Sequence, residues 1–407
     1  YLDNDAIGKS GVEKMAEPLL RGMRGYRQTS RTGEVLQEVP AQNGKDVRLT
    51  IDIDLQRQLT EILAKRGQGS AVVIDVKTGQ VLAMVSVPTY NLNTYRADSR
   101  YLNNNDVDLP LKNRAVARRY PPGSTVKPVA ALAAMGCGLS PNQQYECKHI
   151  LNMPGVGNNF RCDSLYGHGW LGMEAAIQKS CNIYFYNVGR FVGADSLAQW
   201  FRLLGFGSLC GTGLPEEVAG NIQPTDRPTR IADPMQWAIG QGSFDATPLQ
   251  VANAMAAVAR GQYLSPTILL DGAPQQVRRD IPLRIDQIDV VRKGMWEVVN
   301  TPEGTAYKVF HQGGQRLTGD VIVCGKTGTA DTPPMKIDTD GDGRLDTIVH
   351  GGEDEANMAW FSGYASYTDP QIAFAVVIEF VPEHGSTAAG PIAVEIVRMC
   401  KEKGYVR

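Results

Sequence analysis

Residues 120–127 read Tyr-Pro-Pro-Gly-Ser-Thr-Val-Lys and lead into an alanine-rich apolar run over residues 126–135. The run predicts a buried helix, at whose start Ser124 and Lys127 lie three positions apart on one face. A desolvated lysine loses proton affinity, so its neutral amine can take the proton of a neighbouring hydroxyl. The stretch therefore predicts a serine nucleophile with a lysine base, although a serine N-cap followed by a surface lysine gives the same pattern.

Two further motifs follow along the chain. Residues 180–182 (Ser-Cys-Asn) come after a predicted helix and offer a hydroxyl and an amide that can relay a proton and hold a substrate carbonyl. Residues 325–329 (Gly-Lys-Thr-Gly-Thr) end a predicted strand, in which side-chain alternation directs Lys326 and Gly328 to one face. A lysine beside glycines lets an extended peptide approach the strand edge and present its carboxylate to the cation. Ser-x-x-Lys, Ser-x-Asn and Lys-Thr-Gly, in that order, are the motifs of penicillin-recognising serine acyl-transferases.

Two similar triplets lack this context. Residues 77–79 (Lys-Thr-Gly) precede Ser124 and fall in a predicted hairpin turn, and residues 140–142 (Ser-Pro-Asn) follow a predicted helix end and form a loop. The chain contains no Gly-x-Ser-x-Gly elbow and no His-Glu-x-x-His motif. The usual hydrolase and zinc-peptidase alternatives are therefore excluded.

The 407 residues are enough for two to three domains and a large core. A β-hairpin is predicted over residues 71–76 and 81–87, after a short strand at 47–53 and a helix that begins near Leu55. The elements predicted beyond residue 135 are helices at 173–179, 183–191, 196–204, 249–259, 286–299 and 391–401, and strands at 319–326, 356–361 and 371–380. Strands at both ends with helices between them predict an α+β fold whose sheet joins the first and last parts of the chain.

Charge and hydropathy exclude other classes. Lys and Arg number 41 against 43 Asp and Glu, and this balance provides no basic surface for nucleic acid. The apolar runs are much shorter than the ~20 residues that cross a bilayer. The chain begins at Tyr1 without a signal sequence, so we expect that any exporting or anchoring segment has been removed from it.

The chain resembles the transpeptidase domain of class B penicillin-binding proteins, and more narrowly the elongation-type branch called penicillin-binding protein 2. The segments that carry the resemblance are residues 7–13, 20–22, 49–56, 120–127, 213–217, 239–242, 247–250, 304–306 and 359–364. The resemblance implies a penicillin-binding/β-lactamase-like serine acyl-transferase fold, with a central antiparallel sheet and helices on both sides. It also implies a linker or pedestal remnant over residues 1–46 and a transpeptidase domain over residues 47–407.

The activity implied by the resemblance is a D,D-transpeptidase that cross-links peptidoglycan and is a target of β-lactams. Ser124 is then the nucleophile for the D-Ala-D-Ala carbonyl of a stem peptide, and Lys127 is the base. Ser180 and Asn182 shuttle a proton and hold the donor. The carboxylate meets Lys326 and Thr327 beside Gly328, and the N–H groups of Ser124 and Thr329 form the oxyanion hole. No cofactor is needed for catalysis.

Location and partners are likewise implied by family. The resemblance places the domain on the periplasmic side of a bacterial inner membrane, anchored by an N-terminal helix that this chain lacks. It implies a membrane-embedded glycan polymerase and shape-determining scaffold proteins as partners.

Two other functions share the same motifs. A D,D-carboxypeptidase or β-lactamase would pass the acyl group to water, and Glu217 resembles the acid that activates this water in some β-lactamases. A non-catalytic β-lactam sensor or scaffold would acylate without turnover.

A cysteine cluster lies between the first two motifs, within residues 145–182. Three of the seven cysteines, Cys147, Cys162 and Cys181, together with His168, provide the ligands of a closed tetrahedral zinc site. A Cys147–Cys162 disulfide and unpaired buried thiols are the alternatives. By resemblance, elongation-type relatives carry zinc at this place with Asp, His and Cys ligands, so Asp163 is an alternative ligand.

An acidic insertion spans residues 331–356. Asp338, Asp340, Asp342 and Asp346 match positions 1, 3, 5 and 9 of a calcium loop, and Gly343 matches the glycine at position 6. Position 12 is Val349 instead of glutamate, so a calcium site needs Glu353 or Glu355 to reach back. The alternative is an acidic surface insertion without metal.

Overall fold

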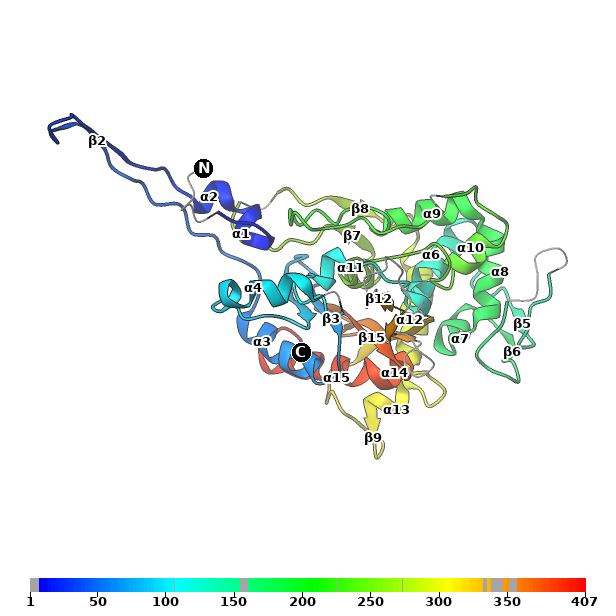
Figure 1. Cartoon of the computed structure of the whole chain (residues 1–407). Coiled ribbons are helices and arrows are strands. Elements are labelled where there is room, and N and C mark those ends of the chain that lie inside the picture. Colours follow the sequence, from blue (N-terminus) through cyan, green and yellow to red (C-terminus); the bar gives the residue numbers. More distant parts are fainter. Residues whose placement is uncertain are drawn as a thin grey trace.

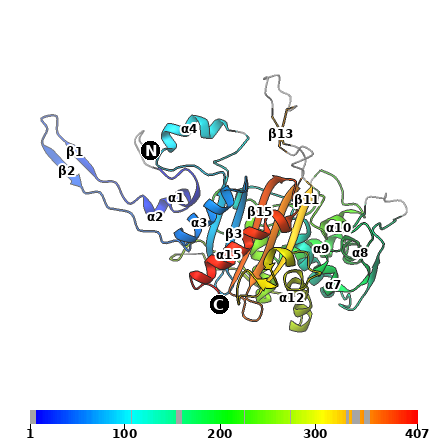
Figure 2. The same cartoon turned by 90° about the horizontal axis from the view of Figure 1, so that it is seen from below.

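The computed structural model describes residues 7–105, 107–153, 160–224, 226–272, 274–331, 335–337, 347–350 and 357–407. Its central sheet has five strands in the order β11-β14-β15-β3-β4, and all neighbours are antiparallel. The strands are β3 (Gly69–Asp75), β4 (Val81–Val87), β11 (Val323–Asp331), β14 (Asn357–Ala365) and β15 (Ile372–Val381). The sheet thus joins the first and last parts of the chain, as predicted (Figure 2).

Helices cover both faces of this sheet. Helix α11 (Pro248–Arg260) packs on one face, and helices α3 (Ile53–Ala64), α14 (Gly385–Ala388) and α15 (Gly390–Glu402) pack on the other (Figure 1). Residues 248–259 of α11 are all buried, because the sheet lies on one side and further helices on the other. A helix that is apolar around most of its circumference needs such a position. Strands β14 and β15 are buried on both faces for the same reason, which explains their nearly continuous apolar sequences.

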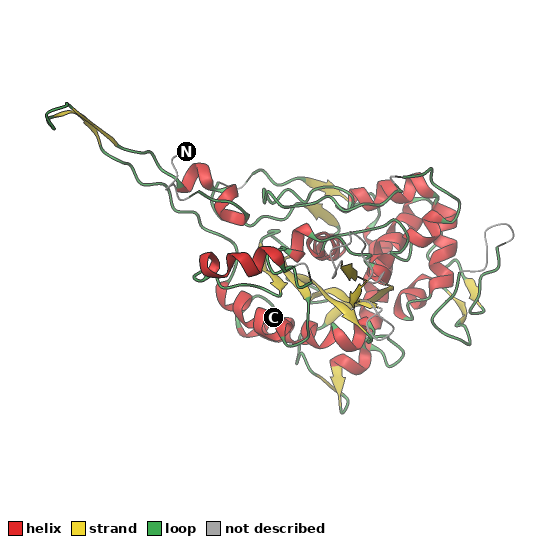
Figure 3. Ribbon diagram, viewed as in Figure 1, coloured by secondary structure: helices red, strands yellow, loops and turns green. Residues whose placement is uncertain are grey.

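A helical part flanks the β11 edge of the sheet (Figure 2), and its helices are drawn in red in Figure 3. Its helices are α6 (Lys127–Gly136), α7 (Met173–Gln178), α8 (Asn182–Val192), α9 (Ala194–Leu203), α10 (Asp233–Trp237) and α12 (Ile285–Asn300). The remaining helices are α1 (Gly11–Met15), α2 (Glu17–Leu20), α4 (Tyr95–Asn104), α5 (Arg114–Ala117) and α13 (Tyr307–Phe310). The helix predicted from residue 126 is α6, preceded by a 3₁₀ turn over Gly123–Val126.

Short hairpins complete the structure. Their strands are β1 (Tyr26–Thr29) with β2 (Val35–Val39), β5 (Tyr145–Cys147) with β6 (Gly169–Leu171), β7 (Gln262–Leu264) with β8 (Arg278–Asp280), β9 (His311–Gln312) with β10 (Gln315–Arg316), and β12 (Met335–Ile337) with β13 (Thr347–His350). The β1–β2 hairpin projects away from the body, and its residues are exposed (Figure 1). Within the described ranges, no helix combines the length and apolar character of a membrane span.

Three local predictions differ from the structure. The strand predicted over residues 47–53 does not form: Leu49 makes a bridge with Leu269, and Ile53 already begins α3. The polar connection before residue 120 contains helices α4 and α5, which its low apolar content did not indicate. The Lys-Thr-Gly motif lies in the middle of β11 and not at a strand end, because this strand continues beside β14 to Asp331.

Candidate active site

The candidate nucleophile is presented by a tightly held turn. Gly123 has a φ of +55°, and a Cβ atom there would lie 2.8 Å from Thr329 O on β11. The Gly123 N–H donates to Gly240 O, and Trp360 Nε1 donates to Pro121 O at 3.1 Å. Ser124 itself is half-buried, and its Oγ makes no hydrogen bond with any residue that the structure describes. The turn therefore leaves this hydroxyl available to a substrate.

A buried ionic cluster lies behind the turn. Glu379 on β15 pairs with Arg114 at 2.8 Å and with Arg118 at 3.0 Å, and both Arg114 and Glu379 are fully buried. Tyr120, four residues before Ser124, donates its hydroxyl proton to Glu379 Oε1 at 2.5 Å. The cluster fixes the start of the first motif to the central sheet.

The three motifs meet at the side chain of Ser180. Lys127 Nζ lies 3.2 Å from Ser180 Oγ and donates to Asn182 Oδ1 at 2.6 Å. Lys326 Nζ donates to the same Ser180 Oγ at 2.8 Å. Ser180 holds a φ of +54°, which is unfavourable for a residue with a side chain and is typical of functional sites. One hydroxyl thus bridges lysines from the first and third motifs.

Both lysines are shifted towards their neutral forms. Burial lowers the pKa of Lys127 from 10.5 to about 8, against the opposing effect of the Asp163 carboxylate. Burial also lowers the pKa of Lys326 well below its usual value, and the neighbouring Lys127 lowers it further. Two ammonium groups that share one hydroxyl repel each other, so the site favours at least one neutral amine. A neutral lysine is the proton acceptor that a serine nucleophile requires.

The third motif forms the opposite wall. Lys326 pairs with Ser362 across the sheet, and Gly328 pairs with Trp360. A Cβ atom on Gly328 would lie 2.8 Å from the Thr125 side chain, so only glycine fits between β11 and the nucleophile turn. Thr327 shares a hydrogen bond of 2.8 Å with Thr305.

Sequence reasoning gave no role to two residues that shape the site. Gly240, at a φ of +74°, lies so close to Gly123 that a Cβ atom would collide with its backbone. Thr305 orients the Thr327 hydroxyl through their shared bond. Both fall in segments noted only for resemblance, Ile-Gly-Gln-Gly at 239–242 and Gly-Thr-Ala at 304–306. For Gly240, the signal was that glycine stands at both contacting positions, 123 and 240, which are far apart in the sequence. No signal distinguished Thr305 from other threonines.

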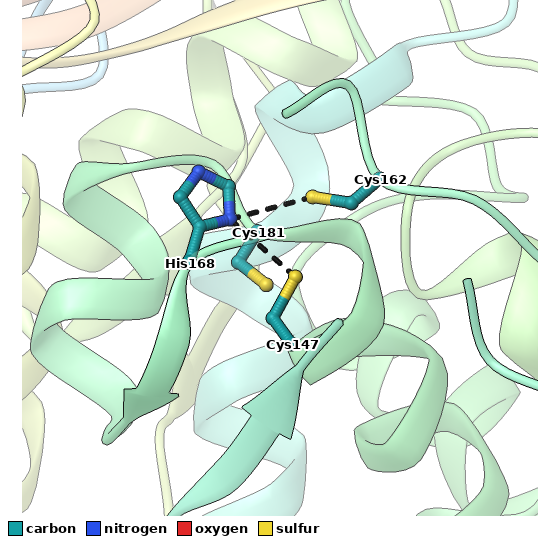
Figure 4. A group of neighbouring side chains, drawn as sticks. All are labelled: Cys147, Cys162, His168 and Cys181. Carbon is teal, nitrogen blue, oxygen red and sulfur yellow. Dashed lines mark hydrogen bonds between the residues drawn. The ribbon is translucent and has the colours of Figure 1, made fainter. Parts of the chain in front are cut away.

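The candidate zinc ligands come together beside the second motif (Figure 4). His168 Nδ1 lies 3.4 Å from Cys162 Sγ and 3.6 Å from Cys147 Sγ. In a tetrahedral zinc site, Zn–N and Zn–S bond lengths require about 3.6 Å between such atoms. The ligand atoms of these residues and Cys181 all lie within 4.8 Å of one another. The donor set and its spacing therefore fit a closed zinc site.

The thiols of this cluster differ in their electrostatics: burial raises the pKa of Cys147, and the hydrogen bond with Cys162 raises that of Cys181, whereas the pKa of Cys162 is lowered. The hydrogen bond from Cys181 lowers the pKa of the Cys162 thiol, and the one with His168 lowers it further. All seven cysteines are free thiols in the structure.

Of the other predicted residues, Asp163 and Glu217 have different surroundings from those expected. Asp163 lies outside the Cys/His cluster, and its Oδ1 accepts a hydrogen bond from Asn182 Nδ2 at 3.3 Å. The four aspartates of the calcium hypothesis, Asp338, Asp340, Asp342 and Asp346, lie outside the described residues. Glu217 accepts from the backbone N–H groups of Cys210, Gly211 and Thr212 and from the Thr212 hydroxyl, so its oxygens hold a loop together.

An antiparallel sheet with helices on both faces and a serine turn beside its edge strand has the fold of the penicillin-recognising serine acyl-transferases. Residues 69–398 match the family of penicillin-binding protein transpeptidase domains, and the chain belongs to this family. Among curated relatives, it is 34% identical to the peptidoglycan D,D-transpeptidase MrdA of Haemophilus influenzae, over 98% of this chain and 63% of that protein. It is 31% identical to MrdA of Escherichia coli K12, over 98% of this chain and 64% of that protein. The chain therefore spans a little under two thirds of these relatives.

Solved structures give the same assignment. The chain matches PBP2 of Helicobacter pylori in complex with MreC at a TM-score of 0.83 and 28% identity, over 98% of this chain and 73% of that one. It matches Pseudomonas aeruginosa PBP2 in complex with WCK 5153 at a TM-score of 0.77 and 30% identity, over 97% and 84% of the two chains. A peptidoglycan synthase complex in which polymerization and crosslinking are coordinated matches at 0.79 and 29%, over 99% and 71%.

Proposed function

We propose that this chain is the catalytic part of a peptidoglycan D,D-transpeptidase and a target of β-lactams. The observation that carries the proposal is the meeting of three motifs at Ser180, where Lys127 and Lys326 reach one hydroxyl beside the Ser124 turn. Relatives that span nearly the whole chain bear this activity in their names.

In the proposed reaction, Lys127 takes the proton of Ser124 as Oγ attacks the carbonyl of the D-Ala-D-Ala bond. The low pKa of this buried lysine supports that role. Asn182 holds the donor, while Lys326 and Thr327 bind the terminal carboxylate beside Gly328. The N–H groups of Ser124 and Thr329 stabilise the oxyanion. Ser180, between the lysines, passes a proton to the departing amine, and an acceptor amine then attacks the Ser124 ester.

The test follows one covalent adduct and one product. Intact mass after incubation with a penicillin is expected to show a long-lived adduct on the wild type and none on Ser124→Ala. A D-Ala-D-Ala donor with an amine acceptor is expected to give a cross-linked product. Rapid loss of the penicillin adduct would favour a β-lactamase, release of D-Ala without cross-linking would favour a carboxypeptidase, and an adduct with neither product would favour a sensor. Glu217, whose oxygens are occupied by its own loop, supports the transpeptidase over the β-lactamase.

We further propose that Cys147, Cys162, His168 and Cys181 hold a structural zinc ion. Four protein ligands leave no open position for water, so the ion would brace the second motif without taking part in the reaction. Elemental analysis of protein purified without chelators is expected to give one zinc per chain. A thiol count two short of seven in unreduced protein would instead indicate a disulfide.

The domain division, location and partners are also proposed. We assign residues 47–407 to the transpeptidase domain and residues 1–46 to a linker or pedestal remnant, on the periplasmic side of an inner membrane. A membrane-embedded glycan polymerase and a scaffold protein are proposed as partners, because similar structures include PBP2 with MreC and a peptidoglycan synthase complex. Co-purification of the chain with an MreC-like protein tests the scaffold, and deletion of the projecting β1–β2 hairpin tests whether it lies at that contact.

A further inference from the structure

Asp163 places a carboxylate on the solvent side of the candidate active site. Asn182 Nδ2 donates to Asp163 Oδ1 at 3.3 Å and to Arg161 O at 3.2 Å, while Asn182 Oδ1 accepts from Lys127 Nζ at 2.6 Å. One amide thus connects the buried lysine with this carboxylate. Asp163 is exposed, whereas Lys127 is fully buried, so the connection runs from the interior of the site to its surface.

Asp163 supplies a negative charge beside motifs that otherwise carry only positive charge. The described motif residues supply two lysines and no carboxylate. Asp163 acts on both, since its charge raises the pKa of Lys127 and of Lys326 against the effect of burial. Together with Asp331, at the end of β11, it also raises the pKa of Tyr186, after the larger effect of burial. Among the residues that the structure describes, Asp163 forms no ion pair and is available to an external cation.

The proposed reaction brings a cation to this place. A primary amine with an ordinary pKa near 10 arrives as an ammonium group at neutral pH. The positive charge that remains on the pair Lys127 and Lys326 repels it, and an exposed carboxylate beside Asn182 offsets that repulsion. A charge-assisted hydrogen bond between ammonium and carboxylate also gives the amine a defined position.

We infer that Asp163 binds the ammonium group of the amine substrate at the entrance of the active site. This rests on the proposed transpeptidase function. The bound ammonium group gives one proton to water, and the neutral nitrogen attacks the carbonyl carbon of the Ser124 ester. The new C–N bond forms as the bond from carbon to Ser124 Oγ breaks. The second proton of the nitrogen passes through Lys127 to Oγ, which restores the serine.

The experiment compares a cationic acceptor with a neutral one in the whole chain. Wild type, Asp163→Asn and Asp163→Glu are acylated with a D-Ala-D-Ala peptide whose amino groups are acetylated. The acyl-enzyme is then offered either a stem peptide with a free primary amine or hydroxylamine, which is neutral at pH 7. For Asp163→Asn we expect the KM for the cationic acceptor to rise about tenfold, with transfer to hydroxylamine unchanged. Asp163→Glu should restore the KM because it keeps the charge.

Asp98→Asn is the matched control, because Asp98 is an exposed carboxylate on α4, outside the three motifs. It should leave both KM values unchanged. Penicillin acylation of Asp163→Asn should be no slower than that of the wild type, since this step uses no amine and loss of the carboxylate charge only lowers the pKa of Lys127 further. A second donor, which has a free side-chain amine, shows which substrate carries the bound cation. If Asp163→Asn slows acylation by this donor only, the carboxylate binds an ammonium group of the donor, and the acceptor assignment is overturned.

Equal losses with both acceptors, or slow penicillin acylation, would mean that Asp163 only positions Asn182 and would overturn the inference. The experiment distinguishes failure of the Asp163 inference from failure of the proposed transpeptidase function. If the wild type transfers to neither acceptor, the transpeptidase proposal fails. If the wild type transfers and Asp163→Asn does so with the same KM, only the Asp163 inference fails. Zinc content and melting temperature are measured for each variant, because Asp163 follows Cys162 in the chain.

Discussion

Lys326 Nζ donates a hydrogen bond to Ser180 Oγ at 2.8 Å, although 146 residues separate them in the chain. Ser180 begins the second motif before α8, and Lys326 lies in the middle of the edge strand β11. The contact places a hydroxyl between the helical part and the sheet, where a peptide on β11 would lie. Acid–base chemistry at this position therefore depends on how firmly the two parts are held together.

Acylation should depend on pH through Lys127. Burial lowers the pKa of this lysine to about 8, and the neutral amine that can accept a proton predominates only above that value. The rate of penicillin acylation should therefore rise about tenfold per pH unit below pH 8 and level off above it. Stopped-flow measurement between pH 6 and 9.5 checks this. A rate that is flat across the range would exclude Lys127 as the titrating base.

Substitution of Lys127 extends the same test. Lys127→Arg should nearly abolish acylation, because a guanidinium group stays protonated. Lys77→Ala removes the lysine of the other Lys-Thr-Gly triplet, which pairs with Asp369 on the surface, and should be silent. Equal losses in the two variants would mean that the chemistry has been misplaced.

Gly240→Ala should disrupt the nucleophile turn. The added Cβ would collide with Gly123, next to Ser124, and the positive φ of Gly240 adds strain. Because displacement of a reacting group by about 1 Å costs on the order of 100-fold in rate, acylation should fall by at least that factor. Gly138→Ala is the matched control, since Gly138 has a φ of +94° and open space around it. If acylation by Gly240→Ala stays near the wild-type rate, the close contact does not position the nucleophile.

Glu379→Gln should destabilise the protein strongly. The substitution leaves Arg114 buried without its carboxylate and weakens the hold on Tyr120. Loss of one partner of a buried pair costs about 3–5 kcal/mol in the free energy of unfolding, which denaturant titration can measure. Glu38→Gln, in an exposed pair with Arg27, should cost less than about 1 kcal/mol. Similar losses for both would argue against a structural role for the buried cluster.

Removal of the proposed zinc should weaken both stability and acylation. Cys181 is the middle residue of the second motif, so an ion bound to it would fix the backbone that carries Ser180 and Asn182. A chelator, or Cys181→Ser, should therefore lower the melting temperature and slow penicillin acylation of Ser124. Unchanged melting and acylation after complete removal of the metal would rule out the brace.

The sequence by itself determined the motifs and the main elements. Ser124 and Lys127 are three residues apart at the start of an apolar run, so local helix geometry was sufficient to pair them. The hairpin β3–β4 and helices α7, α8, α9, α11 and α12 were likewise predicted, because apolar periodicity is a local property. Helices α4 and α5 were missed because their polar sequence carries little of this signal.

Only the tertiary structure decided which residues from distant parts of the chain are in contact. The sequence pattern predicted a strand that ends at Lys326, but β11 continues beside β14 to Asp331. Hydrogen bonds to a neighbouring strand outweigh the low strand propensity of glycine. The contact of Gly240 with Gly123, the bond between Thr305 and Thr327, and the position of Asp163 beside Asn182 all join segments far apart in the chain. Such contacts depend on how complete elements pack, and no local pattern of residues encodes them.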